Sequence, residues 1–114
     1  MDRVALHSSD PRLTIQPIRP PSGGDTLTLA LTGELDVHSV TSLCDVAVAS
    51  VESGIRRLRL DMTGVTMCDN GSLYMLLGLQ HALRATGGAL AIATTSAPVE
   101  SALTANGLSH LLEN

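Results

Sequence analysis

The stretch Leu58–Leu73 constrains the fold of this chain more than any other part of the sequence. It begins as a short apolar strand, Leu58–Asp61, passes through a polar turn, and returns to apolar residues before the polar segment Asp69–Ser72, which we call the hinge. The hinge opens the longest apolar-periodic segment of the chain, a pattern that predicts a helix. A strand that delivers a polar loop to a helix N-terminus presents free backbone N–H groups and small polar side chains together. We therefore expect the function to depend on the hinge.

The residues before this stretch predict a β-hairpin. Residues 1–11 have no periodicity and are expected to form a loose tail, and residues 13–18 give a weak strand pattern. The segment 20–25 is rich in Pro and Gly and predicts a turn. Thr26–Thr32 alternates threonine with aliphatic residues, as a half-buried strand does, and Gly33 is expected to end that strand.

After the hairpin, predicted helices alternate with predicted strands. Asp36 is the expected N-cap of a first helix, with Ser39 close to it. The apolar face of this helix consists of Val40, Leu43, Cys44, Ala47, Val48 and Val51. Gly54 is expected to end the helix, and Ile55–Asp61 to form the next strand. A short helix between two strands implies a parallel crossover.

The second helix is expected to run from the hinge to about Thr86. Ala89–Ala93 reads as a continuous buried strand, and Pro98 begins a third helix that ends at Asn106. The order is therefore ββαβαβα, which indicates an α/β fold with a mixed sheet and helices packed on it. Residues 12–114 are expected to form a single domain.

Composition excludes several classes of function. The formal net charge is −4 and the only aromatic residue is Tyr74, which argues against nucleic-acid binding by phosphate capture or base stacking. The four histidines lie at no metal-ligand spacing, and the chain has no lysine, phosphate-binding loop or nucleophile motif. We therefore expect no metal site, no cofactor and no enzymatic activity.

The cysteines and the hydropathy of the chain indicate where in the cell the protein is expected to be found. Cys44 and Cys68 are far apart in the sequence and are expected to be buried reduced thiols. No apolar run approaches the length of a membrane span, and residues 1–10 contain no hydrophobic signal region. These features predict a cytoplasmic protein with no membrane insertion.

Two polar motifs have structural explanations that compete with functional ones. Asp61–Gly64 is explained by a turn, because the phosphate-binding loop that a nucleotide hydrolase needs is missing. In the hinge, Asp69 or Asn70 can simply cap the helix. A serine in the first helical turn is also a favourable place for a phosphate, because the free N–H groups and the helix dipole stabilise its charge. Such a switch requires a partner, and the apolar arc from Leu73 to Met75 is a candidate surface for one.

Two separated motifs carry a family resemblance. Gly33-Glu34-Leu35-Asp36 and Leu60–Asp69, followed by Leu73, resemble the STAS domain of bacterial anti-sigma factor antagonists, and the similarity extends from about Leu13 to Leu112. The resemblance implies the ββαβαβα STAS fold. It also implies binding to an anti-sigma factor that is a serine protein kinase, which frees a sigma factor for transcription. In such proteins, phosphorylation at the hinge ends the interaction.

The hinge departs from the family pattern of Asp, two hydroxyl residues and Gly. With Asp69 and Leu73 kept in register, Asn70 takes the first hydroxyl position, Gly71 takes the phosphoacceptor position, and Ser72 stands where the family has glycine. Ser72 is therefore the remaining candidate for phosphorylation, and we expect the switch to be lost or altered. The positions that the resemblance assigns to partner contact are Asp36, His38, Asp69, Asn70, Gly71, Ser72, Tyr74 and Met75.

The sequence thus predicts a regulatory protein-binding module, an anti-sigma factor antagonist. Two alternatives stay open. Some small STAS proteins support the ATPase of an ABC-type lipid-transport complex through the same hinge without phosphorylation, and other STAS modules sense a small ligand. The sequence does not decide whether the protein forms a homodimer.

Overall fold

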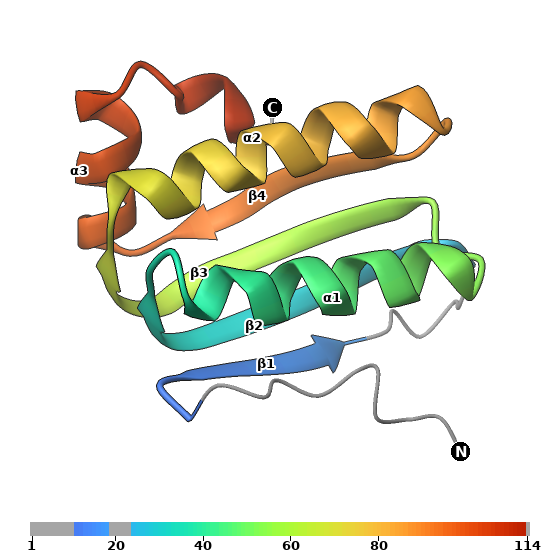
Figure 1. The fold of residues 1–114 in the computed structure, drawn as a ribbon, viewed down its shortest axis with the longest axis horizontal. Helices are drawn as coiled ribbons and strands as arrows, with labels where there is room; N and C mark the ends of the chain where they lie inside the picture. Colours follow the sequence, from blue (N-terminus) through green and yellow to red (C-terminus); the bar gives the residue numbers. More distant parts are fainter. Residues whose placement is uncertain (1–10, 19–23, 114) are drawn as a thin grey trace.

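The computed structural model describes residues 11–18 and 24–113. The elements are β1 (Leu13–Ile18), β2 (Thr26–Leu35), α1 (Ser39–Glu52), β3 (Arg57–Cys68), α2 (Asn70–Ala85), β4 (Ala89–Thr95), α3 (Ala97–Ala105) and a short 3₁₀ helix, η2 (Ser109–Leu111) (Figure 1). The predicted order ββαβαβα is confirmed. The expected tail, apart from Pro11, and most of the expected turn at 20–25 lie outside the described residues.

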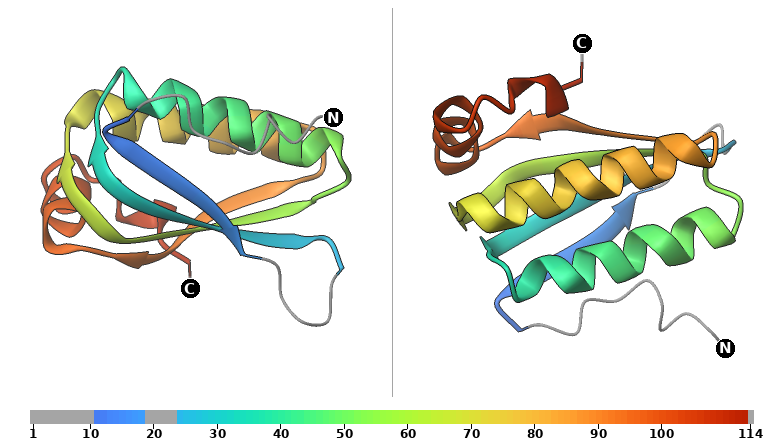
Figure 2. Two further views of the ribbon diagram at one scale, coloured as in Figure 1. Left: turned by 90° about the horizontal axis from the view of Figure 1, so that it is seen from below. Right: turned by 45° about the horizontal axis from the view of Figure 1, so that its top comes forward.

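The sheet is mixed, with strand order β1-β2-β3-β4. β1 pairs antiparallel with β2, whereas β2, β3 and β4 are parallel, as expected for strands joined by helices. Helices α1 and α2 lie side by side on one face of the sheet (Figures 1 and 2). Both helices therefore begin at the edge of the sheet where β2 and β3 end, and this places the two loops that precede them next to each other.

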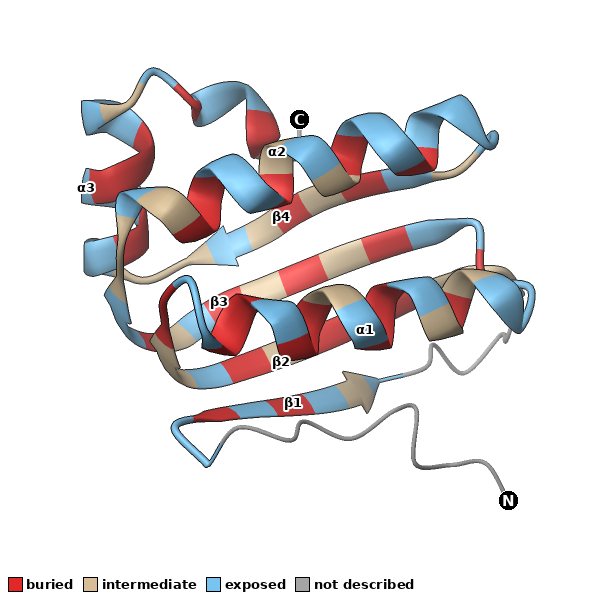
Figure 3. Ribbon diagram, in the orientation of Figure 1, coloured by how far each residue is buried: buried red, intermediate tan, exposed pale blue. Residues whose placement is uncertain are grey.

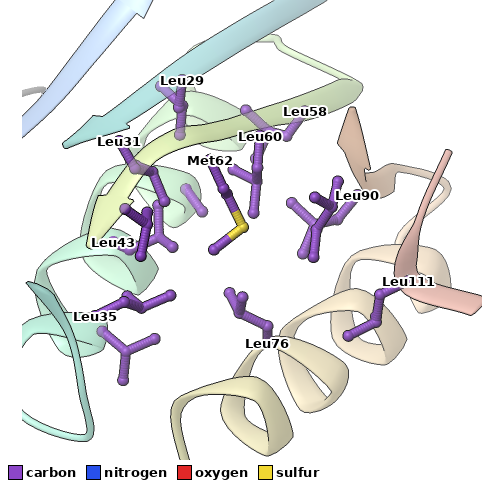
Figure 4. Packing of buried hydrophobic residues seen from close by; sticks show 14 of the residues in the cluster. Leu29, Leu31, Leu35, Leu43, Leu58, Leu60, Met62, Leu76, Leu90 and Leu111 are labelled. Carbon is purple, nitrogen blue, oxygen red and sulfur yellow. The ribbon is translucent and has the colours of Figure 1, made fainter. Parts of the chain in front are cut away.

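The core between these helices and the sheet is aliphatic. The largest fully buried side chains come from both layers and include Leu29, Leu31, Leu35, Leu43, Leu58, Leu60, Met62 and Leu76 (Figure 4). Each helix carries a buried stripe toward the sheet and an exposed outer face (Figure 3). Val48 was expected in the core but is 46% exposed, because Ala47 and Val46 take the inward positions of that turn.

Both predicted breaks in the strands are wrong. Gly33 does not end β2, which continues to Leu35 through a register shift; Gly33 has φ +116°, a backbone conformation that glycine adopts without a steric penalty. The Asp61–Gly64 segment is not a turn but the middle of β3. The Asp61 carboxylate accepts bonds from Thr63 and from Thr94 of β4, which holds an irregular segment inside the sheet.

The edge strand β4 is also less buried than expected. Within β4 only Leu90 and Ile92 are buried, because α2 packs on one face of the strand. The end of the chain protects its outer edge: Leu112 forms a bridge with Ile92, and the Glu113 N–H donates to the Ile92 carbonyl at 2.8 Å. Within residues 11–18 and 24–113, no helix is both long and apolar enough to cross a membrane.

Candidate functional site

The hinge is held by the carboxylate of Asp69. Asp69 is the N-cap of α2, and its Oδ1 accepts the backbone N–H of Ser72 at 2.8 Å. Its Oδ2 accepts the N–H of Val37 at 3.3 Å, and its own N–H donates to the Leu35 carbonyl at 3.1 Å. One residue therefore caps the helix and ties the hinge to the loop between β2 and α1. The sequence predicted a cap by Asp69 or Asn70, and the structure assigns it to Asp69; the link to Val37 was not predicted.

A reciprocal set of bonds orders the loop between β2 and α1. The Asp36 carboxylate accepts the N–H groups of His38 and Ser39, each at 2.9 Å, and the Ser39 hydroxyl accepts the Asp36 N–H at 3.0 Å. Helix α1 begins at Ser39, so the residue at the N-cap position is His38, and its side chain makes no capping bond. The predicted capping by Asp36 is present, but it acts from two residues further upstream.

Arg12 fixes this loop from the other side. Its guanidinium binds the Asp36 carboxylate in bidentate fashion, at 2.5 and 3.1 Å. The backbone bond from Ser39, followed by the bond from Arg12, holds the pKa of Asp36 well below its usual range. No local pattern predicts this role for Arg12, because it precedes Asp36 by 24 residues.

Gly71 and Val37 are in close contact where the two loops meet. A Cβ built on Gly71 would lie 2.5 Å from Cγ1 of Val37, so any side chain at this position requires Val37 to move. Val37 itself is 44% exposed. The contact therefore closes the junction between the loops and leaves an apolar surface above it.

Ser72 points inward. The residue is 0% exposed, and its hydroxyl donates to the Asp69 carbonyl at 2.8 Å and lies 3.4 Å from the Leu35 carbonyl. The Sγ of Cys68 lies 3.8 Å from the same hydroxyl. In this conformation neither a kinase nor a partner can reach the Ser72 hydroxyl.

A third segment joins the site from the end of α3. The side-chain amide of Asn106 donates to Oδ1 of Asn70 at 2.8 Å and to the Ala102 carbonyl at 2.8 Å. The Tyr74 hydroxyl donates to Oδ1 of Asn106 at 3.5 Å. From the sequence, Asn106 was predicted only to end a helix. Because 36 residues separate it from Asn70, no local pattern could have revealed this contact.

The predicted contact residues thus fall into two groups. Asp36 and Ser72 are buried and organise the loops. The others are partly or fully accessible, and Tyr74 and Met75 are 51% and 40% exposed. Together with Val37, the accessible members form what we call the hinge surface: Val37, His38, Asp69, Asn70, Gly71, Tyr74 and Met75. Their contact with a partner stays a prediction.

The cysteines and acidic residues give no sign of a metal centre. Within the described part of the chain, no group of three or more His, Cys, Asp or Glu side chains is placed to hold a metal ion. Cys44 and Cys68 are free and half-buried, and burial raises the pKa of both thiols. Both cysteines are therefore less buried than expected.

Comparison with known proteins assigns the family. The family model described as "Mlab, STAS domain" matches residues 18–113. The chain belongs to the STAS-domain family. The resemblance recognised in the motifs at Gly33–Asp36 and Leu60–Asp69 is thereby confirmed.

Solved structures share the fold of this STAS domain. The unphosphorylated anti-sigma factor antagonist SpoIIAA matches with a TM-score of 0.71 and 19% identity, covering 88% of this chain and 86% of that chain. An anti-sigma factor antagonist from Mycobacterium paratuberculosis matches with a TM-score of 0.72 and 16% identity, covering 91% and 86%. The STAS domain of an antagonist from Rhodobacter sphaeroides gives 0.59 and 16%, covering 82% and 95%. At these identities the likeness establishes the fold.

The lowered pKa of Asp36 predicts how the stability of this STAS domain depends on pH. Because the folded-state pKa is depressed, the stabilisation by the Asp36 carboxylate is complete above its unfolded value of about 4 and is lost as the pH falls toward the folded value. In urea unfolding between pH 6 and pH 2, Asp36→Asn should therefore be less stable than the wild type at pH 6, with the difference shrinking below about pH 4. A difference that does not change with pH would contradict this role.

Proposed function

We propose that this STAS domain is an anti-sigma factor antagonist, a regulatory module that binds an anti-sigma factor of the serine-kinase type through the hinge surface and so frees a sigma factor. It acts in the cytoplasm by binding rather than by catalysis. The observation that carries the proposal is the link between two loops at the ends of β2 and β3 through Asp69, which fixes an accessible surface on both. The structural neighbours described as anti-sigma factor antagonists support the same class of partner.

The chemistry of the hinge surface indicates what the partner must offer. Val37, Tyr74 and Met75 provide exposed apolar area, and aromatic residues and methionine are enriched in protein interfaces. The Asp69 carboxylate accepts bonds from backbone amides, and among the described residues no cationic side chain pairs with it. A partner that presents an apolar patch beside a basic or hydroxyl group would therefore complement the surface.

Calorimetry with candidate serine-kinase anti-sigma factors tests the proposal. We expect the wild-type protein to bind one of them and Asp69→Ala to bind it more weakly, because that change releases both the α2 cap and the Val37 amide. If no candidate binds, or if the two proteins bind equally well, the proposal is wrong.

The hinge should resist phosphorylation. Gly71 has no hydroxyl, and the Ser72 hydroxyl is fully buried and bonded to the Asp69 carbonyl. After incubation with the partner kinase and ATP, mass spectrometry should find no phosphate on Ser72. The double variant Val37→Gly/Gly71→Ser is the positive control, since it offers a hydroxyl and removes the side chain that would clash with it. Phosphate on Ser72 of the wild-type protein would contradict a lost switch.

The absence of an accessible hinge hydroxyl also favours a second candidate function, support of the ATPase of an ABC-type lipid-transport complex. Such a role uses the hinge surface without phosphorylation. Recovery of an ABC ATPase with the wild-type protein, and its loss with Asp69→Ala, would favour this function over the first.

A further inference from the structure

Two Asn-Gly pairs meet in the folded chain. Asn70-Gly71 begins α2 and Asn106-Gly107 follows α3, and the two asparagine side chains share a hydrogen bond of 2.8 Å. Asn-Gly is the dipeptide in which a side-chain amide is lost most readily, because glycine hinders least the attack of its own backbone nitrogen on the preceding asparagine. The surroundings of the two pairs differ in ways that bear on this reaction.

We propose that Asn70 is a site of spontaneous deamidation, through which the hinge gains a negative charge without a kinase. The attacking group is the backbone nitrogen of Gly71, and in the described residues this N–H has no protein acceptor, as is usual in the first turn of a helix. The corresponding N–H of Gly107 donates to the Thr104 carbonyl at 3.3 Å. Asn70 is exposed, whereas Asn106 is half-buried and its amide donates two bonds.

The reaction needs only water. The Gly71 nitrogen bonds to Cγ of Asn70, the bond from Cγ to Nδ2 breaks, and ammonia leaves with the proton that Gly71 gives up. Water then opens the five-membered imide at either carbonyl and leaves aspartate or isoaspartate at position 70.

Two features of the site assist the attack. The Asn106 amide donates to the oxygen that becomes negative as the Gly71 nitrogen adds to Cγ of Asn70, and a positioned donor stabilises such an oxygen. Gly71 lies in the first turn of α2, so its N–H has no intrahelical bond that must break before the nitrogen turns onto Cγ.

The products alter the hinge surface in two ways. Aspartate at position 70 places a second carboxylate beside Asp69, and isoaspartate also lengthens the main chain by one methylene next to the Gly71–Val37 contact. If the hinge surface binds the proposed partner, both products weaken that binding. This consequence rests on the proposed function, whereas the chemical step does not.

Peptide mapping by mass spectrometry tests the chemical step. The folded protein is incubated at mildly alkaline pH, and conversion to aspartate plus isoaspartate is followed at positions 70 and 106. Asn70 should react several-fold faster than Asn106 in the folded protein, and the two should react at similar rates in urea, where only the local Asn-Gly sequence matters. Equal rates in the folded protein, or faster conversion of Asn106, would overturn the proposal.

Two variants complete the test. Asn70→Gln prevents formation of the five-membered ring, so conversion at position 70 should disappear while Asn106 keeps its rate. Asn70→Asp carries the charge of one product and should bind the partner several-fold more weakly than the neutral Asn70→Gln, and equal affinities would overturn the regulatory consequence. If no partner binds the wild-type protein, the proposed function fails, and the peptide map still decides the chemistry.

Discussion

Gly33→Ala should lower the free energy of unfolding by about 3 kcal/mol or more, through backbone strain and a steric clash that add together. Gly33 has φ +116°, and a Cβ at this position would lie 2.1 Å from the Arg12 carbonyl oxygen. That oxygen cannot withdraw freely, because it accepts the Glu34 N–H at 2.9 Å. The same segment carries the guanidinium that holds Asp36, so the substitution should also loosen the loop between β2 and α1.

Gly78→Ala is the matched control. Gly78 is exposed within α2, and a Cβ built on it meets nothing within 4 Å. Alanine should therefore stabilise the protein by about 0.5–1 kcal/mol, because glycine is the weaker helix former. Urea unfolding of both variants measures the two effects. The comparison requires that the free energy of unfolding falls with urea concentration as steeply in each variant as in the wild-type protein. A Gly33→Ala variant as stable as the wild-type protein would contradict the positive φ and the close backbone contact at Gly33.

The order of the elements was predictable because the signals for it are local. The alternation in Thr26–Thr32 and the apolar periodicity after the hinge show which side chains of a single strand or helix face the core. Both can be recognised within one segment of the sequence. The predicted strand end at Gly33 and the predicted turn at Asp61–Gly64 were wrong because glycine and aspartate favour turns when only neighbouring residues are considered. Pairing with strands distant in the sequence keeps both segments inside the sheet.

The candidate site was predictable to a similar degree. The cap at Asp69 depends on neighbours within three residues, and the local sequence predicted a cap at Asp69 or Asn70. Val37 and Asn106 reach the hinge from 32 and 36 residues away, and Arg12 reaches Asp36 from 24 residues away. No helix or strand period links such positions. The fold alone brings them together, and it links the helix cap to segments that are distant in the sequence.

A charge added to the hinge surface can be tested for its effect on partner binding separately from its effect on folding. Gly71→Glu should reduce affinity for the partner about tenfold or more, which corresponds to about 1.4 kcal/mol. The new side chain must displace Val37, because its Cβ would lie 2.5 Å from Cγ1 of that residue. It also places a carboxylate beside Asp69 on a surface expected to meet apolar and basic groups. Folding should change little, since a glutamate in the first turn of a helix is favoured by the helix dipole.

Gly78→Glu introduces the same side chain two turns further along α2, beyond the hinge surface, and should keep the affinity of the wild-type protein. The double variant Val37→Gly/Gly71→Glu removes the clash and keeps the charge. Because Val37 itself belongs to the hinge surface, the affinity of the double variant is compared with that of Val37→Gly alone, and the difference measures the effect of the charge. Calorimetry on the wild-type protein and these four variants, with urea unfolding of each, distinguishes lost contact from lost structure. Equal binding by Gly71→Glu and Gly78→Glu would show that the partner docks elsewhere, because only the first change lies where the loops after β2 and β3 meet.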